Sequence, residues 1–89
     1  MQNKHIIVGV HVTDRAQRAG DVQKVFTEYG RNIRTRLGLH EVQDDVCAPN
    51  ALIVLEMHAA EATCNEMIQK LKGIPGIEVQ KMVFDRSGE

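Results

Sequence analysis

Residues 14–33, DRAQRAGDVQKVFTEYGRNI, and residues 71–79, LKGIPGIEV, decide the fold of this chain. Each stretch predicts the end of an amphipathic helix, a glycine-containing turn and the start of a strand. We expect Gly30 to end the first helix, because glycine accepts the left-handed conformation common at that point, and Gly73, Pro75 and Gly76 to end the second. Two such stretches indicate one βαβ half-unit used twice.

Alternating apolar residues predict four strands around the two helices. We expect strands over residues 5–13, 32–42, 51–58 and 77–84, helices over 14–29 and 60–72, and a polar connection over 43–50. The order βαββαβ predicts an α+β, ferredoxin-like sandwich with a four-stranded antiparallel sheet and both helices on one face. Right-handed crossovers would place the first and third strands at the centre of the sheet.

One face of this sheet is expected to pack against the apolar stripes of the helices. The strand residues assigned to it are Ile6, Val8, Val10, Val12, Ile33, Thr35, Leu37, Leu39, Ile53, Leu55 and Met57. The helix residues assigned to it are Ala19, Val22, Val25, Phe26, Tyr29, Cys64, Met67, Ile68 and Leu71. In that setting Cys64 is a small core residue.

Length and composition limit the class of protein. The 89 residues are expected to form one domain, with a core over 4–84 and a short tail over 85–89. A formal net charge of −1 argues against a nucleic-acid binder, which normally has a basic excess. No apolar run approaches the roughly 18–20 residues needed to cross a bilayer, so no membrane partner is expected.

The start of the chain and its cysteines predict a cytoplasmic protein. Residues 1–5 lead directly into a predicted strand, without the apolar segment of a signal peptide. The two cysteines, Cys47 and Cys64, form no C-x-x-C pair and are expected to be reduced thiols.

The sheet face without helices is expected to join subunits. Strand alternation assigns to it Gly9, Arg34, Arg36, His40 and Glu56, together with the predicted oligomer face, His5, Ile7, His11, Leu52, Val54 and His58. Such a face is too apolar to be left to water. We therefore expect a homo-oligomer, a dimer or a tetramer, in which interface histidines could make assembly depend on pH.

A transition metal is an alternative use of the histidines. His40 and Cys47 could contribute to a nickel, zinc or copper site, with Asp44 or Asp45 supplying an oxygen ligand and a second subunit completing the set. No H-x-H or C-x-x-C spacing accompanies them, so a loop cysteine without a ligand role is the competing interpretation. No other cofactor is expected.

Catalysis has no positive signal. The chain contains no G-x-S-x-G, P-loop or G-x-G-x-x-G motif, and no residues spaced as an acid–base pair. We therefore expect a protein that is not an enzyme.

The spacing of residues in the first helix and second strand resembles that of an ACT domain. The matching residues are Asp14, Arg15, Val22, Val25, Phe26, Glu28, Gly30, Asn32 and Ile33. The ACT pattern runs Asp-Arg-Pro-Gly, a helix, then Gly-x-Asn-Ile, and the ending over 71–79 fits it as well. The resemblance implies an effector site at Asp14, Gln17 and Asn32. Gln17 stands where amino-acid-binding ACT domains have the glycine that lets a ligand approach the backbone.

More narrowly, the chain resembles the small stand-alone ACT-like proteins known as iron-only hydrogenase system regulators. The shared stretches are residues 33–38, IRTRLG, the apolar third strand, and residues 76–79, GIEV. Those proteins are similar in fold to the metal-binding domain of the nickel-responsive repressor, and lack its DNA-binding arm. That repressor has an H-x-H pair, whereas here Gly38 stands in place of the first histidine, two residues before His40.

Two functions follow as expectations. The first is a non-enzymatic regulatory or ligand-sensing module that acts as an oligomer, binds a small effector or a partner protein, and serves the iron-only hydrogenase system. The alternative is a transition-metal sensor or carrier that uses His40 and Cys47 at a subunit interface.

Overall fold

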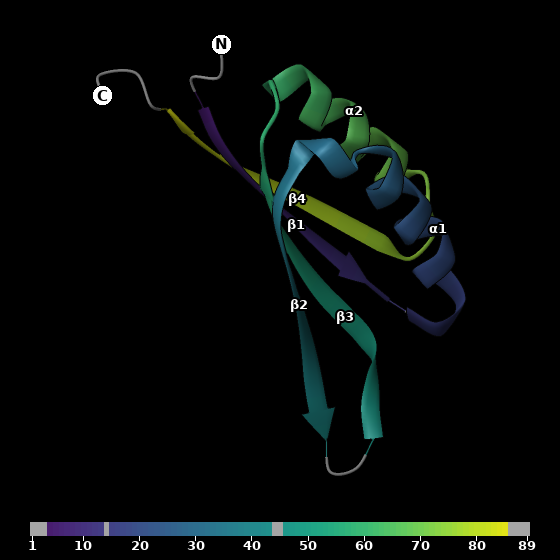
Figure 1. Ribbon diagram of the computed structural model, residues 1–89. Coiled ribbons are helices and arrows are strands. Elements are labelled where there is room, and N and C mark those ends of the chain that lie inside the picture. Colours follow the sequence, from purple (N-terminus) through teal and green to yellow (C-terminus); the bar gives the residue numbers. More distant parts are fainter. Residues whose placement is uncertain (1–3, 14, 44–45, 86–89) are drawn as a thin grey trace.

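The computed structural model describes residues 4–13, 15–43 and 46–85, with backbone alone at 15–17, 40–43 and 46–50. Its elements are β1 (Lys4–Val12), α1 (Arg15–Glu28), a 3-10 turn η1 (Gly30–Asn32), β2 (Ile33–Gln43), β3 (Val46–Met57), α2 (Glu61–Lys72) and β4 (Ile77–Asp85). The strand order is β2-β3-β1-β4 and all neighbours are antiparallel (Figure 1). The predicted ferredoxin-like fold, with the first and third strands at the centre, is confirmed.

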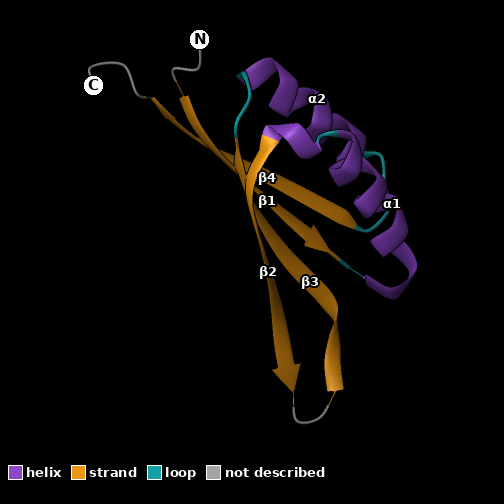
Figure 2. Cartoon of the chain, viewed as in Figure 1, coloured by secondary structure: helices purple, strands orange, loops and turns teal. Residues whose placement is uncertain are grey.

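The two helices lie on one face of the sheet and bury its apolar side chains (Figure 2). Alternate β1 residues, from Ile6 to Val12, are at most 2% exposed. The helices add Val22, Phe26, Tyr29, Cys64, Met67, Ile68 and Leu71 to this core. Full burial of one such large apolar side chain contributes about 1.5–3 kcal/mol. In the described part of the chain neither helix has the length and apolar character of a membrane-spanning segment.

A β-bulge in β2 overturns the predicted faces of that strand. Ile33 pairs with Met57 but Thr35 pairs with Glu56, so Arg34 is an extra residue. One extra residue moves every following side chain to the other face, because strand side chains alternate. The core assignment of Thr35, Leu37 and Leu39 was therefore wrong.

The side chains after the bulge show the change directly. Leu37 and Leu39 are 54% and 44% exposed, on the face without helices. Arg36, predicted to face away from the helices, pairs with the buried Leu55 and places its guanidinium 4.9 Å from the centre of the Phe26 ring of α1. Because of the bulge, Arg36 lies on the helix side of β2, and Leu37 and Leu39 lie on the side without helices.

The predicted polar connection over 43–50 is also wrong, because most of it is strand. β2 runs to Gln43 and β3 begins at Val46, and the two strands form a hairpin that extends beyond the helices (Figure 1). β1 pairs with β3 only from Ala51 onward. Pro49 therefore lies where β3 has no neighbour on the β1 side, and within the register shift opposite His40 and Val42, a position at which a strand tolerates a residue without an N–H group.

Gly76 ties the turn before β4 to the end of β1. Its carbonyl oxygen accepts a hydrogen bond of 2.9 Å from the Thr13 amide. Its φ of +82° lies in the left-handed region, and an added Cβ would lie 3.2 Å from the Thr13 carbonyl oxygen. Glycine is therefore required here both by conformation and by space.

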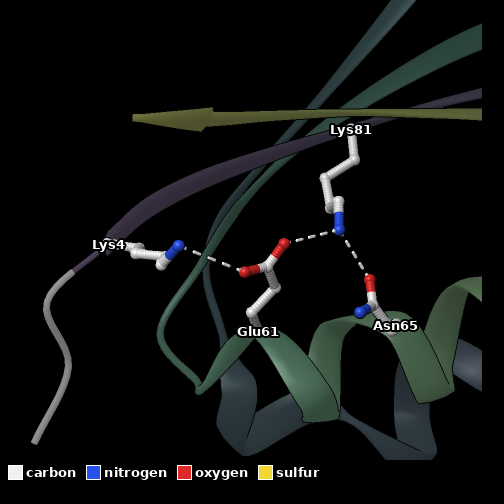
Figure 3. A network of polar contacts seen from close by, with 4 residues as sticks. All are labelled: Lys4, Glu61, Asn65 and Lys81. Atoms are coloured by element: carbon white, nitrogen blue, oxygen red, sulfur yellow. Dashed lines mark hydrogen bonds and ion pairs between the residues drawn. The ribbon is translucent and has the colours of Figure 1, made fainter. Parts of the chain in front are cut away.

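Charged side chains attach the start of α2 to the sheet (Figure 3). Glu61 forms ion pairs with Lys4 of β1 at 3.4 Å and with Lys81 of β4 at 2.9 Å. Lys81 also donates to the Asn65 side-chain oxygen at 2.7 Å. The hydrogen bond from Lys81, followed by the charges of both lysines, lowers the pKa of Glu61. A carboxylate in the first turn is further favoured by the helix dipole.

We predict opposite effects on stability for two Gly→Ala substitutions. Gly76→Ala should lower the free energy of unfolding by about 1–2 kcal/mol, because alanine is strained in the left-handed region. Gly20→Ala, inside α1 with open space around its Cα, should raise it by about 1 kcal/mol. Urea denaturation followed by circular dichroism measures both. Equal stability of Gly76→Ala and the unsubstituted protein would contradict the assigned turn.

Candidate functional site

The face of the sheet opposite the helices, here called the open face, carries residues from all four strands. Its residues are His5, Ile7, Gly9 and His11 of β1, Thr35, Leu37 and Leu39 of β2, Leu52, Val54 and Glu56 of β3, and Glu78, Gln80, Met82 and Phe84 of β4. They form cross-strand rows, since residues that pair directly share a face. One row runs Leu37, Val54, Gly9, Gln80.

Large apolar side chains reach solvent across this face. Besides the two leucines of β2, Leu52, Met82 and Phe84 are exposed, the last two by more than half. Contiguous apolar surface of this kind marks contact sites in soluble proteins. The open face is therefore the principal candidate for an interaction surface.

A depression of about 340 Å³ lies at the centre of the open face, over Gly9. A Cβ on Gly9 would approach only the Gln80 carbonyl oxygen, at 4.0 Å, so the missing side chain leaves the space. Apolar side chains including Ile7 and Val54 line it, and His11, Glu78 and Gln80 add polar groups. An apolar hollow with a few polar groups suits a small ligand or a side chain of a partner.

The start of β1 carries a polar cluster on the same face. Thr35 Oγ1 donates to Glu56 Oε1 at 2.7 Å, and His5 Nε2 lies 2.9 Å from Glu56 Oε2. The hydrogen bonds from Thr35 and then from His5 lower the pKa of Glu56, because they stabilise the carboxylate. Arg34 donates to His58 Nδ1 at 3.1 Å beside this cluster. These bonds tie β1, β2 and β3 together.

Two of the residues predicted for an effector site, Gln17 and Asn32, lie near opposite ends of α1. Asp14 lies outside the described residues, and Gln17 belongs to the first turn of α1 with its side chain outside them. Asn32 lies beyond the other end of this 14-residue helix, about 20 Å away. Its carbonyl oxygen accepts a bond of 2.6 Å from the His58 amide. The effector site at these residues stays a prediction.

The residues predicted for a metal site belong to the β2–β3 hairpin. His40 pairs with Ala51, and Cys47 pairs with Val42, whereas the side chains of both lie outside the described set. Within the described residues, no three His, Cys, Asp or Glu side chains gather as a metal site would need. The metal site at His40 and Cys47 stays a prediction.

Two predicted histidines and one cysteine have clear positions. His5 and His11 lie on the open face but at opposite ends of β1, about 20 Å apart, so they cannot share a ligand within one chain. Cys64 is a fully buried, free thiol of the core, as predicted. Burial raises the pKa of this thiol.

Sequence reasoning missed part of the open face. The contribution of β4, above all Met82 and Phe84, could have been found from its alternation with the buried Val79. The contribution of Leu37 and Leu39 had no such signal. These residues alternate regularly with Ile33 in the sequence, and they lie on the opposite face from it because of the bulge alone.

Comparisons with solved structures bear on the fold. The chain is similar to the uncharacterized protein TM1266 from Thermotoga maritima, with a TM-score of 0.78 and 23% identity over 92% of this chain and 99% of that one. It is also similar to CPII, a nitrogen regulatory PII-like protein from Thiomonas intermedia K12 bound to ADP, AMP and bicarbonate (TM-score 0.56, 8% identity, 93% and 94% covered).

A third solved structure is a dimeric ferredoxin-like protein from an uncultured marine organism (TM-score 0.54, 9% identity, 99% of each chain covered). At these identities the likenesses establish a shared fold. No protein-family model and no curated protein matches the sequence.

We predict that Glu56 makes stability depend on pH. Its folded-state pKa lies below the ordinary value of 4.5, so its contribution is fully present above that pH and is lost as pH falls through the lowered pKa. Glu56→Gln should therefore reduce the free energy of unfolding at neutral pH and flatten its decline in acid. Urea titrations over a pH series test this. Glu78→Gln is the matched control, since among the described residues Glu78 accepts one long bond, of 3.4 Å, from Gln80. An identical acid profile for Glu56→Gln and the unsubstituted chain would refute the assignment.

Proposed function

We propose that this protein is a small, non-enzymatic regulatory module that self-associates through the open face and binds a small ligand. The observation that carries the proposal is the exposed apolar surface spread over all four strands, with Leu37, Met82 and Phe84 each more than half exposed. A lone chain would leave this surface in water, at a cost of roughly 25 cal/mol per Å². Sheet-on-sheet packing with a second copy removes it.

The geometry favours a second copy as the partner. The open face is a broad sheet surface, and two such surfaces pack about 10 Å apart with interdigitating side chains. A two-fold contact needs a surface that complements itself. The open face has both a hollow, over Gly9, and large exposed side chains, Met82 and Phe84, that a second copy could place in such a hollow. A dimeric protein of the same fold supports this choice.

A regulatory role is supported by the kind of chemistry on this face. In the cluster at Glu56, the side chains of His5 and Thr35 form hydrogen bonds with the Glu56 carboxylate. These bonds link neighbouring strands and hold the surface of the open face in place. CPII, which shares the fold, is a regulatory protein that binds ADP, AMP and bicarbonate. A ligand would shift assembly only as far as it prefers one state over the other. The sequence resemblance extends the proposal to the iron-only hydrogenase system as the process regulated.

A transition-metal sensor or carrier is the second candidate. The observation that favours it is the pairing of β2 with β3, which places His40 and Cys47 on adjacent strands of one hairpin. Native mass spectrometry of protein prepared without chelator should then show bound metal that His40→Ala and Cys47→Ser remove. Binding that survives both substitutions would eliminate these ligands.

We predict that Met82→Lys weakens self-association at least about tenfold. Burying a lysine in an apolar contact forfeits the burial of Met82 and opposes desolvation of the charge, and every 1.4 kcal/mol is a factor of ten. Sedimentation velocity over a concentration series measures the effect.

Val83→Lys is the matched control for this experiment. Val83 is the next residue of β4, is 36% exposed, and pairs with the buried Ile6 on the helix side of the sheet. It should retain the assembly of the unsubstituted protein. A monomeric unsubstituted protein, or equal losses in the two variants, would refute assembly through the open face.

A further inference from the structure

A groove of about 220 Å³ lies on the helix side of the sheet, where the β2–β3 hairpin leaves the cover of α1. Val22 and Gln23 of α1 form one wall, and Arg36 and Gly38 of β2 form the other. Val12 and Ile53 line it from the central strands. The groove is thus on the opposite side of the sheet from the open face.

Arg36 is the charged group of this groove. The bulge at Arg34 directs it to the helix side, and its guanidinium lies against the ring of Phe26, which is only 3% exposed. Contact with an aromatic ring holds the guanidinium in place, while its N–H groups remain able to donate. Within the described part of the chain no carboxylate forms an ion pair with Arg36.

Apart from Arg36 and Gln23, the residues that line the groove are apolar or glycine. Val12 and Val22 are nearly fully buried beneath it. Gly38 pairs with Ile53, and a Cβ built on Gly38 meets no atom within 4 Å. The space above this glycine is therefore open, and it lies two residues along the strand from Arg36.

These features define the chemistry of an occupant. A planar guanidinium recognises a carboxylate through paired hydrogen bonds, and the Gln23 amide can add another donor. None of the groove residues that the structure describes is acidic, so no carboxylate among them would form an ion pair with an ammonium group. Arg36 is also the one cation among these lining residues, whereas phosphate groups are usually held by several donors.

We propose that this groove binds a small monocarboxylate with a short apolar body, its carboxylate on Arg36 and its body over Gly38. The inference rests on the proposed function, since it supplies the ligand of that regulatory module. A ligand in the groove would also be coupled to the open face through β2. Arg36 and Gly38 alternate along β2 with Leu37 and Leu39, so a ligand on one side holds the strand that presents both leucines on the other.

The probe is 3-methylbutanoate, titrated into isotopically labelled full-length protein and followed by NMR. Saturable shifts are expected at the Arg36 side-chain N–H, the Gly38 amide and the Gln23 side-chain amide. Leucine, which adds an ammonium group, and 3-methylbutan-1-ol, which lacks the charge, should bind at least about tenfold more weakly. Tighter binding of leucine than of 3-methylbutanoate, or no saturable shift with the latter, would overturn the inference.

Arg36→Met should weaken binding of 3-methylbutanoate at least about tenfold, because it removes the charge and keeps an apolar side chain. Arg34→Met is the matched control, since it removes the same charge from the bulge, beside His58 and away from the groove. Gly38→Val, which adds a strand-favouring side chain to the open space, should abolish binding without loss of fold. Unchanged affinity in Arg36→Met would refute the site.

Sedimentation velocity on the same samples separates this inference from the proposed function. Self-association that persists in Arg36→Met and Gly38→Val, together with lost binding, supports the groove as a ligand site. If either substitution dissociates the unliganded oligomer, the groove is a protein contact and the inference fails. If 3-methylbutanoate binds a protein that is monomeric throughout, the groove stands and assembly through the open face is wrong.

Discussion

The extra residue in β2 is the constraint on which both candidate surfaces depend. Arg34 interrupts the pairing with β3, and the alternation of the strand is inverted from Thr35 to Leu39, before the register shifts again after His40. Without the bulge, Leu37 and Leu39 would face α1 and Arg36 would project from the open face. With it, the apolar side chains extend the open face, and a guanidinium reaches the aromatic ring of Phe26.

The central strand β1 allows a chain this small to have a buried core on one face of its sheet and a binding surface on the other. Its alternate residues from Ile6 to Val12 are buried by the helices, and these supply much of the core. Its other face carries Gly9 at the middle, where the absent side chain creates the hollow. One strand therefore supports the fold on one side and shapes a binding surface on the other.

The two faces also differ in what they can bind. The open face is broad and largely apolar, with the hydrogen-bonded cluster at Glu56 toward one end. Such a surface suits a flat macromolecular partner such as a second copy. The groove, of about 220 Å³, has a single charge, that of Arg36, among the described residues that line it, which suits a small anion. Because β2 contributes to both, a change at the groove can alter the strand that an assembled partner would touch.

Much of the architecture was predictable from local patterns. The alternation in residues 5–13, the helical spacing of Cys64, Met67, Ile68 and Leu71, and the glycine at position 76 each follow from the geometry of a single element or turn. The element order then leaves few topologies, so the ferredoxin-like sandwich and its central strands followed directly. The open-face positions of His5, Ile7, Leu52 and Val54 came from the same alternation.

The candidate sites depended on information that no local pattern contains. Nothing in the residues around Arg34 marks a bulge, since Ile33, Leu37 and Leu39 keep a regular alternation, and the bulge arises from how β2 pairs with β3. The strand character of residues 46–50 was hidden for a related reason, because Pro49 fits a strand only at an edge or a register shift, and both depend on how the strands pair. Sequence by itself determined which elements form and in what order. Tertiary pairing alone decided which face each β2 side chain occupies, because the two faces of a strand differ by a shift of one residue.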